Sequence, residues 1–290
     1  MPAPPASLGL ARTVVMAICA EGLLTLMDAL IKLLTPRYAT LEIAFLRYGF
    51  GSIGALVYAA WARPGWPTRE AALHNGLRAC LIAVIATSFF FALGRLPLAD
   101  AIALSFISPV LTALMGGLLL GERLDWRIAG ALAAGFAGMI LIVGGGLGSA
   151  DYTDDVLIGA AAVLVSAIGY ALNIIMLRHR ATRDPLAQIV LIQNLGPALI
   201  LAVPGLMVWT TPTTQDVALF ALIGVIGVTA HTMLAHAFAR IEAARLAPVQ
   251  YFTLVWGVLF GFVFFAEVPT LVTCLGAGLI VLGTLVTRRR

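Results

Sequence analysis

Three ionisable residues lie within one long apolar stretch near the start of the chain. Glu21, Asp28 and Lys32 are separated by seven and four residues, so in an α-helix all three fall on one narrow face. Two carboxylates on such a face could contact a charged substrate or carry a proton. The alternative for Asp28 and Lys32 is a structural ion pair between neighbouring turns, which we favour for Lys32. For Glu21 both interpretations stay open.

Histidine offers a second kind of chemistry in a later apolar stretch. His231 and His236 are five residues apart, or about 140° around a helix, which does not suit joint ligation of a metal. We therefore expect no metal site and no cofactor. His231 lies deep enough in its stretch to gate a proton or hold a carboxylate. A neutral histidine bonded to a neighbouring helix is the equally open alternative.

Aromatic side chains could provide an apolar surface for a flat ligand. Trp256 lies about halfway along its apolar stretch, which is too deep for the interfacial belt where tryptophan usually lies. It therefore either packs between helices or stacks on a substrate. Phe89 and Tyr170 are further candidates, although core packing is the commoner outcome for each. If a few of these residues line a cavity, the ligand has a flat apolar ring.

The composition determines the environment of these residues. Hydrophobic residues make up 61% of the 290-residue chain and charged residues 11%, whereas about a quarter of the residues of a soluble domain are charged. This excludes an ordinary soluble globule and predicts an integral membrane protein. The apolar stretches are too long and continuous for barrel strands, so we expect helices, which satisfy their own backbone within lipid.

Ten apolar stretches are long enough, at about 20 residues each, to cross a membrane. The connections between them are short, so we expect no soluble domain. The predicted spans are 12–34, 40–62, 73–94, 98–120, 127–146, 156–177, 186–209, 216–238, 246–266 and 270–287.

The basic residues predict the orientation of these spans. If the N-terminus is cytoplasmic, most of the 18 lysines and arginines fall at the termini or in cytoplasmic loops, as the positive-inside rule requires. We therefore expect both termini in the cytoplasm. Topology also explains the net charge of +4, so we expect no nucleic-acid partner.

Two arginines fall inside predicted spans. Arg78 lies near the cytoplasmic end of its span, where we expect its side chain to snorkel to the surface. Arg47 lies deeper and close in sequence to Glu42. It could hold a substrate carboxylate, but we expect a structural ion pair across helices.

The two halves of the chain are related in sequence. The stretch 95–122 aligns without a gap with 240–267, at an offset of 145 residues, which is half of the 290-residue length. Because five spans per half is an odd number, the second half enters the membrane from the opposite side. We therefore predict two inverted five-helix repeats, 1–145 and 146–290, around a site near the midplane, as alternating access requires.

The same offset pairs polar positions in the two halves. Asp28 aligns with Asn173, and a polar residue at both positions favours a role facing the cavity for both. Glu122 and Glu267 also align, at the ends of equivalent spans. They lie on opposite sides of the membrane, so we expect capping or gating contacts rather than one shared site.

The repeated stretch resembles the signature of the EamA family in the drug/metabolite transporter superfamily. The resemblance rests on LPLADA at 96–101, SFISPVLTAL at 105–114 and LLLGERL at 118–124, with a weaker second occurrence at 240–267. It implies a small-molecule transporter in a bacterial inner (plasma) membrane. Within the family, the chain is similar to exporters of amino acids, the aromatic amino acid exporter type in particular.

The second copy departs from this pattern where we expect the substrate to be selected. Pro109 has no equivalent there, and Pro248 stands six residues before the aligned position; both prolines are expected to bend their helices. The expected cavity residues are Glu21, Asp28, Phe89, Ser105, Ser108, Tyr170, Asn173, His231, Gln250, Tyr251 and Trp256. The expected kink or gating residues are Pro109, Pro248, Glu122 and Glu267.

Three functions are weighed on this basis. We predict a secondary transporter or facilitator that exports small metabolites, most readily aromatic or other neutral amino acids, with a carrier of another drug or metabolite as its alternative. A membrane-embedded enzyme lacks support because the sequence has neither a GxSxG nor an HExxH motif. The third is a non-transporting membrane protein. Besides substrate and lipid, a partner could be a second copy, since the small-residue spans 127–146 and 270–287 suit packing within a monomer or a homodimer.

Overall fold

The computed structural model describes residues 6–120, 154–180, 183–240 and 252–286, and short pieces between 126 and 142. All regular elements within these residues are α-helices. Six of the helices are long and apolar enough to cross a membrane, so the chain is a multi-pass membrane protein.

The helices follow the predicted spans closely, and α2 coincides with the predicted span 40–62. They are α1 (Ala6–Leu34), α2 (Thr40–Ala62), α3 (Arg69–Leu93), α4 (Leu98–Ser105), α5 (Ser108–Leu120), α7 (Asp154–Arg180), α8 (Leu186–Met207), α9 (Thr214–Arg240), α11 (Phe252–Phe265) and α12 (Leu271–Val286).

Capping and backbone conformation mark where these helices begin and end. The Thr68 hydroxyl accepts the N–H of Ala71 at the start of α3, at 3.2 Å, which satisfies a donor that has no partner within the helix. Arg63 follows α2 in the left-handed conformation, with φ of 46°, and this reversal ends the helix.

The fourth predicted span is two helices rather than one. α4 ends at Ser105 and α5 begins at Ser108, with a turn at Phe106 and Ile107. The N–H groups of these two turn residues bond to carbonyls three residues earlier, at 3.2 and 3.3 Å. Pro109 has no N–H to bond Ser105 in a continuous helix. The predicted bend is therefore an interruption of the helix.

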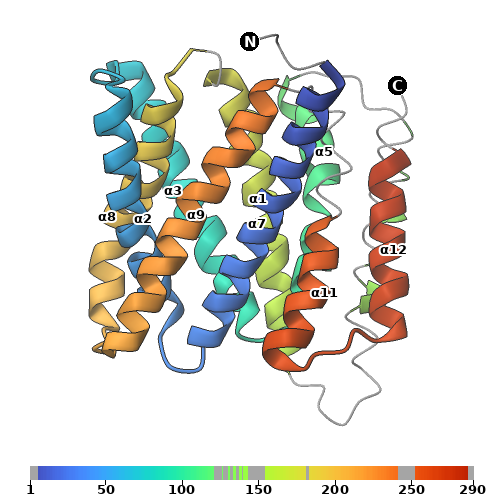
Figure 1. The fold of residues 1–290 in the computed structure, drawn as a ribbon. Helices are drawn as coiled ribbons and strands as arrows, with labels where there is room; N and C mark the ends of the chain where they lie inside the picture. Colours follow the sequence, from blue (N-terminus) through green and yellow to red (C-terminus); the bar gives the residue numbers. More distant parts are fainter. Residues whose placement is uncertain are drawn as a thin grey trace.

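The helices form a closed ring in which each packs on its neighbours. The order around the ring is α1, α9, α2, α8, α3, α7, the α4 and α5 pair, and α11, which returns to α1. Figure 1 shows α1 in front of α7; within the described residues these two helices do not pack extensively on each other. α12 lies beside the ring, against α4 and α5.

Small residues let the helices approach closely. An added Cβ at Gly196 in α8 would lie 2.4 Å from the Cβ of Ala79 in α3, and one at Gly224 in α9 would lie 2.7 Å from the backbone N of Gly51 in α2. Small side chains and backbone take the place of large side chains at these two crossings. Many other large apolar residues are exposed, as expected of helices surrounded by lipid.

The two ends of the ring are named here after α1. α1 begins at Ala6 and ends at Leu34, and α12 ends at the end of the ring where α1 begins (Figure 1). We call these the Ala6 end and the Leu34 end. A Cβ at Gly276 in α12 would lie 2.7 Å from the carbonyl oxygen of Gly138, so the predicted fifth and tenth spans pack together within one chain.

Candidate functional site

Glu21 connects three helices in the middle of the ring. Its side chain on α1 is 9% exposed, and one carboxylate oxygen accepts a hydrogen bond from the Thr253 hydroxyl on α11 at 3.1 Å. Its charge also acts on Tyr170 on α7. Tyr170 is 42% exposed. It is close enough to Glu21 for the two side chains to interact electrostatically.

Trp256 lies against α1 next to this carboxylate. A Cβ at Gly22 would lie 2.9 Å from its indole ring, so only glycine leaves room for this contact. The indole stacks on Phe260, with ring centroids 5.7 Å apart and planes inclined by 17°. Its Nε1 is buried without a hydrogen-bond partner. Trp256 thus combines helix packing with an unused donor.

Arg47 is buried in the ring and forms no ion pair with a described residue. It is 3% exposed, and its Nη1 donates to Asn194 on α8 at 3.3 Å. Its guanidinium carbon lies 4.0 Å from the centroid of the Tyr48 ring. No described carboxylate lies within 4.0 Å of it, so the expected structural ion pair is wrong. Glu42 instead accepts the N–H of Thr210 at 3.1 Å.

Asp28 and His231 lie in the electrostatic field of Arg47. Asp28 is half-buried, and the charge of Glu21 also acts on it. His231 Nδ1 donates to the carbonyl of Gly227 at 2.7 Å, because a carbonyl can only accept. The other ring nitrogen of a neutral His231 is then an acceptor.

These contacts define a central cluster, on α1, α2, α7, α9 and α11. Five of its members were predicted as cavity residues from the sequence. The sixth is Arg47, for which the sequence favoured a structural ion pair over a substrate carboxylate. The central cluster consists of Glu21, Asp28, Arg47, Tyr170, His231 and Trp256.

Lys32 takes part in a different contact from the one predicted. Its ammonium group forms a 2.9 Å ion pair with Glu267 and donates to the carbonyl of Leu96. The predicted pair with Asp28 is not formed, because the ammonium group is engaged by Glu267 and Leu96 instead. Glu267 also accepts the N–H of Leu98 at 2.7 Å and so caps α4.

Asp216 forms a second network at the Leu34 end. It pairs with Arg37 at 2.9 Å and accepts hydrogen bonds from the hydroxyls of Tyr38 at 2.7 Å and Thr213 at 2.8 Å. Burial raises the pKa of Tyr38, and the bond to Asp216 adds to that shift, so the hydroxyl stays a donor. A third ion pair, between Arg95 and Asp155 at 3.3 Å, is more exposed. The three ion pairs whose partners are both described all lie at this end.

The Ala6 end holds a network of amides around Arg78. Arg78 is 2% exposed and donates to Asn173 and Asn75, both at 3.0 Å; Asn75 in turn donates to Asp184 at 2.9 Å. The expected snorkelling of Arg78 is therefore wrong, since its head group is buried among amide acceptors. Asn173 belongs to this network rather than to the central cluster.

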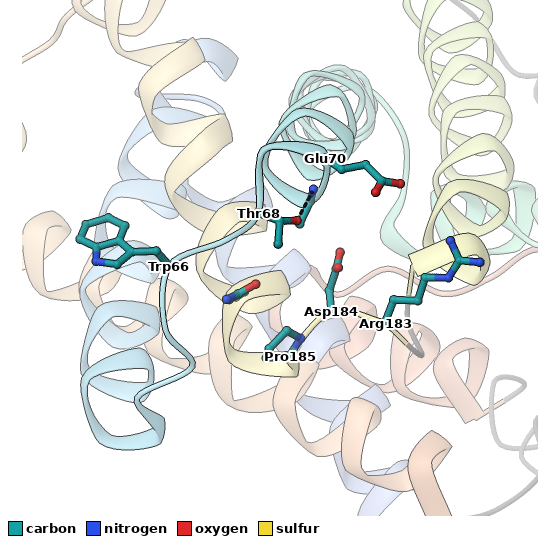
Figure 2. Close-up of a pocket in the computed structure, with 8 residues that line it drawn as sticks. Trp66, Thr68, Glu70, Arg183, Asp184 and Pro185 are labelled. Atoms are coloured by element: carbon teal, nitrogen blue, oxygen red, sulfur yellow. Dashed lines mark hydrogen bonds between the residues drawn. The ribbon is translucent and has the colours of Figure 1, made fainter.

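A pocket of about 380 Å³ opens beside this network. Figure 2 shows Trp66 and Arg183 at opposite sides of it, with Asp184 between them. Its lining comes from the loops before α3 and α8 and from the first turns of these helices. It is separate from the central cluster and contains no residue predicted for the cavity.

The remaining predicted residues are placed as follows. Phe89 is half-buried and packs on the main core, and Ser105 and Ser108 flank the interruption between α4 and α5. Pro109 lies in the first turn of α5. Glu122, Pro248, Gln250 and Tyr251 lie outside the described residues.

Sequence reasoning missed two residues that touch the central cluster. Asn194 bonds Arg47, and Thr253 bonds Glu21. Asn194 carried a usable signal, because an amide deep in an apolar span costs free energy unless it has a partner. Thr253 carried none, since a threonine can satisfy its hydroxyl within its own helix.

The helix ring with ionisable groups at its centre defines a polytopic membrane transporter. The EamA-like transporter family matches the chain twice, over residues 11–144 and 157–289. The chain belongs to this family, and it is a small-metabolite transporter of the drug/metabolite superfamily. The resemblance to the EamA family is confirmed, whereas the similarity to aromatic amino acid exporters stays a prediction.

Similar proteins are named for different substrates. The chain is 27% identical to the pseudopaline exporter CntI of Pseudomonas aeruginosa, over 95% of both chains. It is 25% identical to an S-adenosylmethionine uptake transporter of Rickettsia prowazekii, over 89% of this chain and 86% of that one. It is 27% identical to a riboflavin transporter of Rhizobium johnstonii, over 91% and 87%. A solved crystal structure superposes with a TM-score of 0.63 at 20% identity, over 96% of both chains.

Proposed function

We propose that this chain is a secondary exporter of amino acids, aromatic or other neutral ones. The observation that carries the proposal is the composition of the central cluster. It holds carboxylates, a guanidinium group and a tryptophan with an unused donor, from five helices of one ring. A zwitterion with an apolar side chain offers complementary charge to both kinds of group and an apolar surface to the indole.

Alternating access between two inverted repeats, 1–145 and 146–290, is the proposed mechanism. One support is that the family matches each half separately. A second is that the Thr213 hydroxyl accepts the N–H of Asp216 at 3.2 Å. The Thr68 hydroxyl accepts the N–H of Ala71 at the same distance. These two threonines are 145 residues apart and begin helices at opposite ends of the ring.

The packing of the helices provides a third support. Under the same offset α1, α2 and α3 correspond to α7, α8 and α9. The α1 and α9 contact then corresponds to the α7 and α3 contact, and the α2 and α9 contact to the α8 and α3 contact. Two similar bundles related in this way can rock against each other around a fixed site.

The proposed orientation places both termini in the cytoplasm of a bacterial cell, with the chain in the inner membrane. The Leu34 end then faces outward, and its ion pairs hold the outer side closed in this conformation. Glu267 is the proposed outer gate residue, since it joins α1 to the start of α4. The Gly276 contact within the chain favours a monomer over a homodimer through α12.

A cationic metabolite is a second candidate substrate. The observation that favours it is that Glu21 and Asp28 outnumber Arg47 in the central cluster. Amino acids with neutral side chains and amines of the same shape therefore need to be compared directly.

The test is counterflow into liposomes that contain the purified protein. Labelled phenylalanine, tryptophan, leucine and alanine should exchange, and Trp256→Ala and Asp28→Asn should each reduce the rate. An absence of exchange across a broad amino-acid panel would contradict the amino-acid substrate. Repeating the assay with and without a proton gradient separates a facilitator from a proton-coupled exporter.

A further inference from the structure

Arg47 is a buried cation whose close contacts with the described residues are all neutral. Besides Asn194 and the Tyr48 ring, its Nη2 reaches the sulfur of Met27 at 3.8 Å. Its Nε is buried without an acceptor. A guanidinium group has five N–H donors, so most of those of Arg47 have no strong acceptor among the residues that the structure describes.

Such an arrangement is costly in a membrane. A buried charge without a hydrogen-bonded counterion loses its hydration without compensation. Arg78 provides the comparison within the same chain: it bonds two asparagines, one of which bonds the carboxylate of Asp184. Arg78 thus has a counterion through one bridging amide, whereas Arg47 lacks both a direct and a bridged carboxylate among the described hydrogen bonds.

The guanidinium group is nevertheless held in a defined place. It stacks on the ring of Tyr48, and Asn194 fixes Nη1 from the neighbouring helix. Gly227 on α9 leaves the space for Nη2, since a Cβ there would lie 2.9 Å from that nitrogen. A stacked, planar guanidinium of this kind is suited to bidentate binding of a carboxylate.

Asp28 supplies the opposite charge nearby. It lies in the field of Arg47 without forming an ion pair within 4.0 Å, and it is half-buried whereas Arg47 is buried. Two opposite charges that are close but not paired with each other can each be contacted by one ligand that carries both signs. The sulfur of Met27 is the weakest partner of Arg47 and the one a ligand can displace most readily.

We propose that Arg47 binds the carboxylate of the transported molecule and Asp28 its ammonium group, so that the substrate class is α-amino acids and similar zwitterions. This assignment rests on the proposed function. The carboxylate displaces Met27 from the guanidinium and completes the hydrogen bonds that the protein leaves open. The side chain of the substrate then extends toward Glu21, Tyr170 and Trp256.

The experiment compares matched ligands on the purified protein. Binding is measured by thermal stabilisation for phenylalanine, phenethylamine, which lacks the carboxylate, and phenylpropionate, which lacks the amine; leucine and its two analogues form a second series. Because a charged hydrogen bond contributes strongly, removing the carboxylate should weaken binding to the wild type by about tenfold or more. Arg47→Gln should abolish this difference, and Asp28→Asn should abolish the difference between phenylalanine and phenylpropionate.

Two further variants separate binding from folding. Arg47→Lys keeps the charge but loses the planar fork, so its preference for the carboxylate should be intermediate. Arg69→Gln, at the exposed start of α3, makes the same kind of change outside the ring and should keep the wild-type preference. If Arg47→Gln does not fold, two measurements still test the inference. They are the ratio of the wild-type affinities for phenylalanine and phenethylamine, and the same ratio for Arg47→Lys.

The outcomes distinguish this inference from the proposed function. The inference is overturned if the wild type binds phenethylamine as tightly as phenylalanine, if no carboxylate ligand binds, or if Arg47→Gln keeps the wild-type preference. If instead the preference depends on Arg47 but no amino acid crosses the liposome membrane, the binding assignment stands and the export function fails.

Discussion

Lys32 near the end of α1 and Glu267 just after α11 form a 2.9 Å ion pair that closes one end of the helix ring. The same carboxylate caps α4 through the N–H of Leu98 at 2.7 Å. One side chain thereby holds three helices together. Helices joined in this way have to separate if this end is to open.

Breaking this pair should open the Leu34 end more often. Lys32→Met or Glu267→Gln removes an interaction of mostly buried groups, which contributes about 1 kcal/mol, or about a fivefold shift toward the open state. The measurement is the labelling rate of a cysteine placed at Ser105, in a background with Cys19, Cys80 and Cys274 replaced by serine, by a maleimide that cannot cross the membrane.

The matched control for this experiment is Arg95→Gln. Its pair with Asp155 lies at the same end, but the aspartate side chain is 61% exposed, and exposed pairs contribute little. Labelling should therefore stay near the parent rate. Equal labelling in the Lys32 and control variants would argue against the gate.

Asp216 should be important for stability. Asp216→Asn removes the charge that Arg37, Tyr38 and Thr213 all contact, and hydrogen bonds to a charged group contribute about 1.5–3 kcal/mol each. We expect a melting temperature several degrees lower in detergent. Asp155→Asn, at an exposed position, is the control; a similar fall in both variants would refute the role given to Asp216.

Gly196 should not tolerate even a methyl group. Gly196→Ala places a Cβ 2.4 Å from that of Ala79, and overpacking of this kind costs about 1–3 kcal/mol. Gly49→Ala, in α2, meets nothing within 4 Å and should be neutral or stabilising, because alanine favours helix by about 1 kcal/mol over glycine. Thermal unfolding of the two variants measures the difference, and equal melting temperatures would mean that α3 and α8 can move apart at little cost.

Gly22 should tune the position of Trp256. Gly22→Ala brings a methyl group to 2.9 Å from the indole, so the ring has to shift away from α1. We expect exchange of phenylalanine and tryptophan in liposomes to fall several-fold while exchange of alanine changes less. If both fall equally, the indole contributes to packing and not to selection of the substrate.

Much of the fold follows from the sequence because lipid imposes simple requirements. A run of about 20 apolar residues has to be a helix that crosses the membrane, and α2 matches its predicted span residue for residue. Pro109 similarly lies next to the place where the fourth span breaks, since a residue without an N–H removes one bond of the helix ladder.

The partners of the charged residues depended on tertiary structure. The sequence identified Lys32 and Arg47 as groups that need a partner, and in both cases the partner nearest in sequence was the wrong choice. Helical periodicity determines the face on which a side chain lies, but it does not determine which helix packs on that face. Lys32 meets Glu267 and Arg47 meets Asn194 because the ring brings together helices that are distant along the chain.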